Sequence, residues 1–154
     1  MPDSTKQQII RVTKEFGFEM AHALLGYDGA CMNIHGHSYQ MSVTIIGPVN
    51  NTIDDPKKGM VLDFSLLKEI VASQVLAPLD HALLLNRASE PQLPHLGKEP
   101  FGKVTLVDYQ PTCENILVDI ASKIRQALPA HVSLHHLSLR ETPSSYAEWY
   151  AEDN

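Results

Sequence analysis

Residues 35–47, with the sequence HGHSYQMSVTIIG, alternate in character from one position to the next. Successive side chains of a strand point to opposite faces of a sheet, so this alternation predicts a strand with one buried face. The odd positions form the buried row, which consists of His35, His37, Tyr39, Met41, Val43 and Ile45. Two histidines therefore begin the buried face of this strand, and Gly47-Pro48 ends it.

The preceding segment has the same alternation and ends in a third histidine. Its even positions are nearly all apolar and comprise Ile10, Val12, Lys14, Phe16, Phe18, Met20 and His22. The pattern predicts a half-buried strand over residues 10–22, joined to the strand at His35 by a loop rich in small residues. His22 is thus in phase with the buried face, as His35 and His37 are.

Two amphipathic helices are expected further along the chain. Asp63 can cap a helix over residues 64–77 that Pro78 ends, and Thr112 can cap a second helix that Pro129 ends. Each has an apolar stripe at helical spacing, and the stripes are Phe64, Leu67, Val71 and Val75 in the first and Leu117, Ile120, Ile124 and Leu128 in the second.

A last strand is predicted over residues 132–142, where Leu137, Leu139 and Glu141 share one face. Before the second helix, a Pro-rich segment over about residues 87–109 is expected to be an enlarged loop or hairpin, with a short extra strand near residues 104–107. The order of strand, strand, helix, helix, strand predicts a single α+β domain over residues 1–154, with helices on one face of an antiparallel sheet.

Composition restricts the classes of function. The chain has 154 residues and a formal net charge of −6, which disfavours nucleic acid and anionic membranes as partners. Its two cysteines do not make a disulfide framework, the N-terminal stretch carries no signal pattern, and no apolar run is long enough to span a bilayer. We therefore expect a cytoplasmic protein with neither a membrane nor a nucleic-acid partner.

The three in-phase histidines predict a metal site. His35 and His37 are two residues apart on a strand, so both imidazoles project from the same face, and His22 ends the neighbouring strand. Three neutral nitrogen ligands are typical of a catalytic zinc ion that keeps one position open, and they also suit other divalent ions. The alternative is that these are hydrogen-bonded core histidines.

Four further ionisable residues each have two interpretations. Cys31 is either the fourth ligand of a closed structural site or a free thiol that acts as a base. Asp80 and His81 interrupt an apolar stretch, either as an acid–base pair or as an N-cap followed by a surface histidine. Glu141 either makes an ordinary salt bridge or grips an N–H-rich heterocycle through two hydrogen bonds.

Six separated motifs resemble the family of 6-pyruvoyl-tetrahydropterin and 6-carboxytetrahydropterin synthases. They follow the family's order, cover most of the chain, and are FGFEMAH (16–22), CMNIHGH (31–37), GMVLDF (59–64), LDH (79–81), PTCEN (111–115) and RET (140–142). The resemblance implies a tunnelling fold, in which each chain gives a four-stranded antiparallel sheet with two helices on one side. Trimers would close these sheets into a barrel, and two trimers would stack into a homohexamer with active sites at subunit interfaces.

The resemblance also implies a role for each candidate residue. One zinc ion per chain would be held by His22, His35 and His37. The residues implied in proton transfer are Cys31 as the abstracting base and Asp80, His81 and Glu141 as its relay. Glu141 would also anchor the pterin ring of the substrate, and Thr112 would be a further pterin contact.

Two branches of the family act on 7,8-dihydroneopterin triphosphate. Three residues separate Cys31 from His35, and this spacing, with MVLDF at 60–64, resembles the bacterial 6-carboxytetrahydropterin synthases of queuosine and deazapurine biosynthesis. Their products would be 6-carboxytetrahydropterin, acetaldehyde and triphosphate. The alternative is a 6-pyruvoyl-tetrahydropterin synthase, which eliminates triphosphate from the same substrate. Cations for the triphosphate are expected among Arg11, Lys14, Lys57, Lys58 and a neighbouring subunit's residues.

Two rival hypotheses follow from the residues themselves. One is a non-catalytic zinc domain in which Cys31 closes the metal site as its fourth ligand. The other is a zinc hydrolase, in which an open metal site activates water. The hydrolase leaves the placement of Thr112 and Glu141 without a role.

Overall fold

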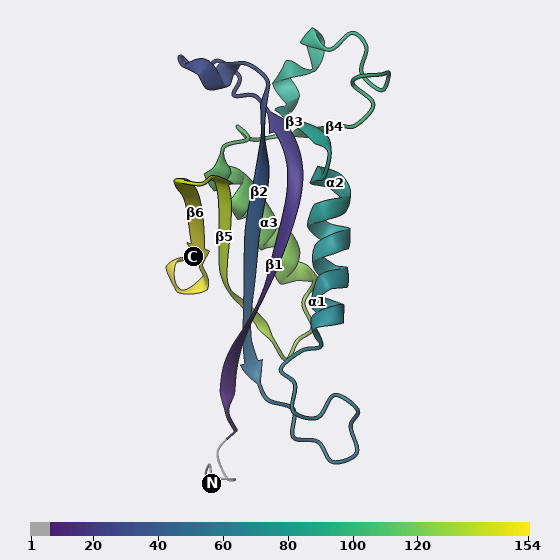
Figure 1. The fold of residues 1–154 in the computed structure, drawn as a ribbon, viewed down its shortest axis with the longest axis vertical. Coiled ribbons are helices and arrows are strands. Elements are labelled where there is room, and N and C mark those ends of the chain that lie inside the picture. The colour runs from purple at the N-terminus through teal and green to yellow at the C-terminus, as the bar shows by residue number, and fades with distance from the viewer. Residues whose placement is uncertain (1–6) are drawn as a thin grey trace.

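The computed structural model describes residues 7–154, which form one six-stranded sheet with helices packed on one of its faces (Figure 1). The strand order is β4-β3-β1-β2-β5-β6. The strands are β1 (Ile9–His22), β2 (His35–Pro48), β3 (Ala82–Asn86), β4 (Val104–Val107), β5 (Ser133–Thr142) and β6 (Ser145–Tyr150). The helices are α1 (Phe64–Val71), α2 (Ala77–Leu79) and α3 (Cys113–Ala127). Residues 1–6, which belong to the N-terminal stretch interpreted above, lie outside the described residues.

The long antiparallel pair of β1 and β2 is the centre of the fold, as the alternating pattern predicts. Its register runs from Ile9 opposite Pro48 to His22 opposite His35, so the three histidines meet at one end of the pair. The helix-covered face of the sheet is apolar below them. Its most buried strand residues are Phe18, Met20, Tyr39, Met41, Val43, Ile45, Leu137 and Leu139.

The predicted α+β fold is confirmed, and the structure extends the sheet. Strands β1, β2, β5 and β6 are antiparallel neighbours. Strand β6 is not predicted by the periodicity of the sequence. Two short strands, β3 and β4, add to the other edge in parallel orientation, with Met20 beside Ala82. The sheet is therefore mixed rather than purely antiparallel.

The first helix is longer than expected. Asp63 caps α1 by accepting the backbone N–H of Ser65 at 2.8 Å, as predicted. A π-helical segment, Ala72–Leu76, follows and leads into α2, which contains Pro78 in its first turn. Pro78 lies at the junction of this π-helical segment with α2, and the helix runs on past it to Leu79. Within residues 7–154, no helix is long and apolar enough to cross a membrane.

The segment over residues 87–109 is an enlarged loop and not a hairpin. It begins with a 3-10 segment, Arg87–Gln92, and returns to the sheet as β4, which confirms the expected short strand. Leu83 lies beside Val104 in a parallel register, and a tight hairpin joins only antiparallel strands. The long return therefore follows from the parallel pairing of β3 and β4.

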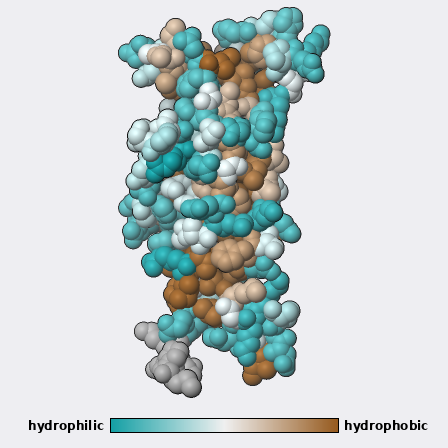
Figure 2. Space-filling model, viewed as in Figure 1, coloured by the Kyte–Doolittle hydropathy of each residue, from teal (hydrophilic) through white to brown (hydrophobic). Residues whose placement is uncertain are grey.

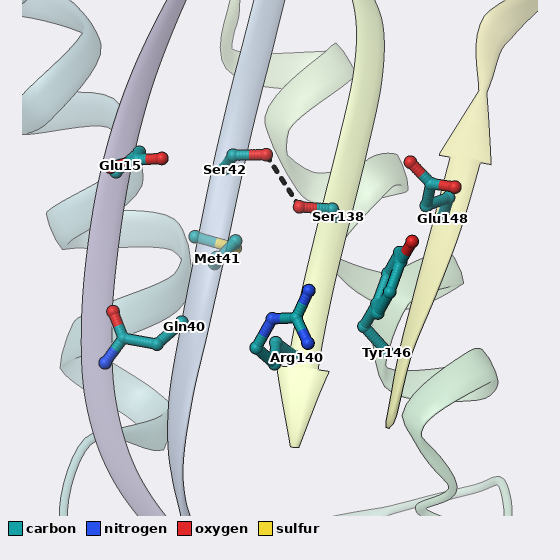
Figure 3. Close-up of a pocket in the computed structure, with 8 residues that line it drawn as sticks. All are labelled: Glu15, Gln40, Met41, Ser42, Ser138, Arg140, Tyr146 and Glu148. Atoms are coloured by element: carbon teal, nitrogen blue, oxygen red, sulfur yellow. Dashed lines mark hydrogen bonds between the residues drawn. The ribbon is translucent and has the colours of Figure 1, made fainter. Parts of the chain in front are cut away.

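The sheet face without helices is polar. Figure 2 shows hydrophilic side chains over the middle of this face, and two pairs of hydroxyl groups hydrogen-bond across its strands, Thr13 with Thr44 and Ser42 with Ser138, both at 2.7 Å. A hollow of about 430 Å³ lies here (Figure 3), in which the Arg140 guanidinium stacks 4.4 Å from the Tyr146 ring centroid. In the described part of the chain, the lining contains carboxylates and one guanidinium but neither histidine nor cysteine.

Candidate active site

Three histidines meet where β1 ends and β2 begins. Their ligand nitrogens all lie within 4.8 Å of one another, and within residues 7–154 they form the one such group of three or more histidine, cysteine or carboxylate residues. His22 faces His35 in the antiparallel register, and His37 follows two residues later on the same face of β2. The structure thus brings together the three residues that the alternating pattern selects.

Backbone carbonyl groups orient two of these rings. The Nδ1 atom of His22 lies 2.7 Å from the carbonyl oxygen of Pro111, and the Nδ1 atom of His35 lies 2.8 Å from that of Asn33. A carbonyl oxygen can only accept, so in both rings Nδ1 carries the hydrogen and Nε2 keeps a lone pair. The second ring nitrogen of a metal-bound histidine commonly makes this kind of contact.

The Nε2 atom of His22 is buried and has no hydrogen-bond partner among the described residues. Burial also lowers the pKa of His22, which favours the neutral imidazole. An orphaned lone pair of this kind is costly unless a ligand meets it. Three converging imidazoles, one with a buried nitrogen that has no hydrogen-bond partner among the described residues, fit a divalent cation well.

One pocket of about 390 Å³ extends from the histidines and includes most of the other candidates. The predicted site residues that line it are His22, Cys31, His35, His37, Thr112 and Glu141. They come from β1, β2, the 3-10 segment Ala30–Met32, the start of α3 and the end of β5. The topology thus collects residues from distant parts of the sequence around one cavity.

Cys31 lines this pocket without joining the ligand group. Its sulfur is not among the atoms that lie within 4.8 Å of one another, although Cys31 precedes His35 by only a short turn. The thiol forms no disulfide and is half-buried. This placement agrees better with a free thiol beside the histidines than with a fourth ligand.

Glu141 is held at the inner side of the pocket. The hydroxyl of Tyr39 donates a hydrogen bond of 3.0 Å to its Oε1 atom, which also lies 3.8 Å from Nε2 of His22. Cys113 lies near the same carboxylate, and burial, followed by the negative charge of Glu141, raises the pKa of its thiol to about 12. The carboxylate of Glu141 therefore faces both the histidines and the pocket.

Thr112 lies at the junction of the pocket and α3. Its hydroxyl accepts the backbone N–H of Asn115 at 3.3 Å, which confirms the predicted N-cap. It also lines the pocket, so one side chain both begins the helix and faces the cavity. The alternatives of cap and contact residue are compatible with each other.

Asp80 and His81 do not line the pocket that contains the histidine cluster. Asp80 Oδ1 accepts the backbone N–H of Glu19 at 2.9 Å and lies 3.0 Å from Nδ1 of His81. The Glu19 N–H holds the pKa of Asp80 below its ordinary value against an opposing effect of burial, and the neighbouring His81 lowers it further. The two side chains are in contact, and His81 lines a different hollow from Cys31. The side chain of His81 is 76% exposed.

The cations considered for the triphosphate do not line the pocket. Arg11 donates to His135 at 2.8 Å, and Lys57 pairs with Asp63 at the other end of the first helix. Among the described residues, the pocket lining includes Glu114 and Glu141 but no lysine or arginine. A positive charge for an anionic group would therefore have to come from outside this lining.

Sequence reasoning missed three residues of the pocket or its wall. Tyr39 shares the buried row of His35 and His37, so its in-phase position was a usable signal. Cys113 follows Thr112 directly and is half-buried beside Glu141. Tyr146 comes from β6, a strand that the periodicity did not predict.

The comparisons with known proteins agree with this geometry. The family model described as 6-pyruvoyl tetrahydropterin synthase matches residues 11–152. The 6-carboxy-5,6,7,8-tetrahydropterin synthase of Haemophilus influenzae is 36% identical over 92% of this chain and 99% of its own, and the synthase of that name from Synechocystis is 33% identical over 91% and 92%. The solved 6-pyruvoyl tetrahydropterin synthase of Caenorhabditis elegans superposes with a TM-score of 0.65 at 27% identity, over 94% of this chain and 97% of its own. In sequence and in fold, the chain belongs to the 6-pyruvoyl tetrahydropterin synthase family.

Proposed function

We propose that the protein is a zinc-dependent 6-carboxy-5,6,7,8-tetrahydropterin synthase. It would convert 7,8-dihydroneopterin triphosphate to 6-carboxytetrahydropterin, acetaldehyde and triphosphate. The observation that carries the proposal is the single pocket in which three metal-ligating histidines, a free thiol and a hydrogen-bonded carboxylate face one another. The relatives with that name support the carboxy branch, because they match at 36% and 33% identity over nearly the whole chain.

His22, His35 and His37 would hold the zinc ion through their Nε2 or remaining ring nitrogens. When bound, the ion would supply a Lewis acid for the hydroxyl groups of the substrate side chain. The carbonyl groups of Pro111 and Asn33 keep two of the rings oriented toward the centre of the cluster. Orientation of this kind reduces the reorganisation that the site needs when a ligand binds.

Cys31 would act as the base that removes a proton from the substrate side chain. Its place on the pocket wall, outside the ligand group, supports this role over that of a structural ligand. Glu141 would accept two N–H groups of the pterin ring, and Thr112 would contact the ring from the start of α3.

Asp80 and His81 would complete the proton relay from a neighbouring subunit. Three features support a homohexamer with shared sites. The side chains of Asp80 and His81 are exposed, and His81 lines a different hollow from its own chain's Cys31. β1 pairs with β3 only over Met20–His22, which leaves most of its outer edge open, and β6 is the opposite edge of the sheet. Open edges of this length are suited to pairing with other chains.

The product would feed queuosine and deazapurine biosynthesis in the cytoplasm, with no membrane or nucleic-acid partner. Substrate incubation tests the function directly. The zinc-loaded protein is mixed with 7,8-dihydroneopterin triphosphate, the pterin product is identified by mass, and acetaldehyde is assayed separately. Carboxytetrahydropterin with acetaldehyde supports the proposal, and no consumption of substrate by folded, zinc-loaded protein contradicts it.

The alternative is a 6-pyruvoyl-tetrahydropterin synthase, favoured by the family model and by the likeness to the Caenorhabditis elegans structure. In the same assay it gives pyruvoyl-tetrahydropterin without acetaldehyde. The less favoured alternative is a non-catalytic zinc domain, which consumes no substrate and needs Cys31 as a ligand. The position of Cys31 outside the ligand group does not favour it.

A further inference from the structure

We infer that Tyr39 is a positioning residue that fixes the carboxylate of Glu141 for substrate binding. The inference rests on the proposed function, in which Glu141 anchors the pterin ring. Tyr39 would not touch the substrate. It would act through Glu141, by holding one of its carboxylate oxygens so that the other remains directed toward the pocket.

The contact between the two side chains is direct. The hydroxyl of Tyr39 donates to Oε1 of Glu141 at 3.0 Å, across 102 residues of sequence. No other side chain among residues 7–154 hydrogen-bonds this carboxylate. Glu141 ends a row of buried residues on β5 and is itself partly exposed, so its long side chain would otherwise be free to choose between rotamers.

Tyr39 is rigid enough to act as a fixed support. Its exposed fraction is 0%, and its ring stacks on that of Phe18 with centroids 5.1 Å apart. The ring of His37 meets it edge to face at 5.4 Å. A buried ring confined on several sides has one position for its hydroxyl group, and a hydrogen bond from that hydroxyl defines where Oε1 lies.

The same oxygen links the anchor to the histidine cluster. Oε1 of Glu141 lies 3.8 Å from Nε2 of His22, so Tyr39 sets the distance between the carboxylate and the histidines. A ligand held by Glu141 would therefore be placed at a defined distance from the cluster. Losing this constraint should weaken substrate binding without removing any histidine.

The test compares two substitutions that make the same chemical change. Tyr39→Phe removes the hydroxyl and keeps the ring with its contacts. The matched control is Tyr109→Phe, because Tyr109 also donates a hydrogen bond to a carboxylate, that of Asp119 at 2.8 Å, but does not line the pocket. For Tyr39→Phe we expect KM for 7,8-dihydroneopterin triphosphate to rise by about ten- to a hundredfold, from the loss of a bond to a charged group. We expect kcat to change much less and zinc content not to change.

A double-substitution cycle separates positioning from a general structural effect. If Tyr39 acts through Glu141, Tyr39→Phe should have no further effect on the binding of 7,8-dihydroneopterin in a Glu141→Gln background, as followed by pterin fluorescence. In the double variant, residue 141 is no longer a carboxylate that has lost its hydrogen-bond donor. The double variant can therefore still be compared with Glu141→Gln if Tyr39→Phe alone does not fold.

Each result has one meaning. Two results together support the inference. KM rises in Tyr39→Phe but not in Tyr109→Phe, and Tyr39→Phe does not weaken binding of 7,8-dihydroneopterin any further in the Glu141→Gln background. Wild-type KM in Tyr39→Phe, an equal rise in Tyr109→Phe, or full additivity in the cycle overturns it and leaves the proposed function in place. A wild-type protein that neither binds 7,8-dihydroneopterin nor consumes its triphosphate overturns the proposed function and this inference together.

Discussion

The imidazole of His22 hydrogen-bonds the carbonyl oxygen of Pro111 at 2.7 Å, 89 residues further along the chain. This contact assigns the hydrogen to Nδ1 and leaves Nε2 buried, without a hydrogen-bond partner among residues 7–154, and close to the ring nitrogens of the other two histidines. The first residue of the PTCEN motif thus has a structural part in the histidine cluster. The strand of β1 positions the ring, and the turn before α3 sets its tautomer.

Removing one histidine of the cluster should remove the metal. His37→Ala deletes one of three ligands and leaves the His22–Pro111 bond in place, so zinc affinity should fall by more than the 10- to 100-fold typical of losing an outer partner. Zinc per chain, measured by mass spectrometry of the metal after dialysis, checks this. The exposed His95 on the enlarged loop is the control, and His95→Ala should keep its zinc. Equal zinc in both variants would contradict the assignment.

Cys31→Ala separates catalysis from structure. We expect it to retain zinc and its assembly state, and to lose turnover by about 100-fold or more, as the removal of a general base does. Steady-state kinetics and metal analysis on one preparation measure both quantities. Met32→Ala, on the same 3-10 segment and 58% exposed in wild type, is the matched control. If Cys31→Ala loses its zinc, the result would instead favour a structural site in which Cys31 is the fourth ligand.

The two thiols should differ in reactivity. The raised pKa of Cys113, about 12, leaves only about one thiolate in ten thousand at pH 8, and the thiolate is the reactive form. Iodoacetamide at pH 8 should therefore label Cys31 well before Cys113, as measured by peptide mass mapping over time. Comparable labelling rates would show that Glu141 and burial do not suppress ionisation of Cys113.

Asp80 should make stability depend on pH in the acid range. The pKa of its carboxyl is lower in the folded state, chiefly because the Glu19 N–H donates to it. Its contribution is complete above the unfolded value of about 4 and disappears as the pH falls through the folded value. Between pH 5 and pH 3, the Tm of metal-free Asp80→Asn should therefore fall less than the Tm of the metal-free wild type.

Asp108→Asn is the control for this measurement, because the Asp108 side chain is 81% exposed. It should follow the wild-type dependence of Tm on pH. An Asp80→Asn protein that loses Tm as steeply as wild type would mean that the Glu19 contact adds no acid-sensitive stability.

Shared active sites predict recovery of activity on mixing subunits. Cys31→Ala lacks the thiol, and His81→Ala lacks a member of the exposed pair, so each homo-oligomer should be inactive. Mixed oligomers formed after dissociation and reassembly would contain some sites with both groups intact. We expect turnover to reappear at a fraction of the wild-type rate. Two Cys31→Ala preparations mixed in the same way should stay inactive, and absence of recovery in the first mixture would place both groups in one chain.

Much of the fold could be predicted because its central strands alternate so regularly. The buried rows that end at His22 and begin at His35 have a period of two, and the structure pairs them in register. Helix caps at Asp63 and Thr112 are equally local signals, and both are confirmed. The histidine cluster was predictable for the same reason, since it depends on phase along neighbouring strands.

The rest depends on contacts that no local pattern contains. β3 is an apolar run that reads equally as strand or helix, and its parallel pairing with β4 is fixed only by the sheet. The contact of Tyr39 with Glu141 arises because β2 and β5 are neighbours. The placement of His81 in a different hollow from Cys31 is likewise a property of the whole topology.

The three histidines and most of the other pocket residues come from different parts of the chain, and this has an evolutionary consequence. The histidines belong to one hairpin-like pair of strands, whereas Thr112, Cys113, Glu141 and Tyr146 come from the start of α3 and from β5 and β6, which extend the sheet beside β2. At the pocket, side-chain hydrogen bonds join the strand pair to this later segment from His22 to Pro111 and from Tyr39 to Glu141. Substitutions in the later segment can therefore change what the cavity accepts while leaving the ligand set intact, which gives one scaffold room to acquire different chemistries.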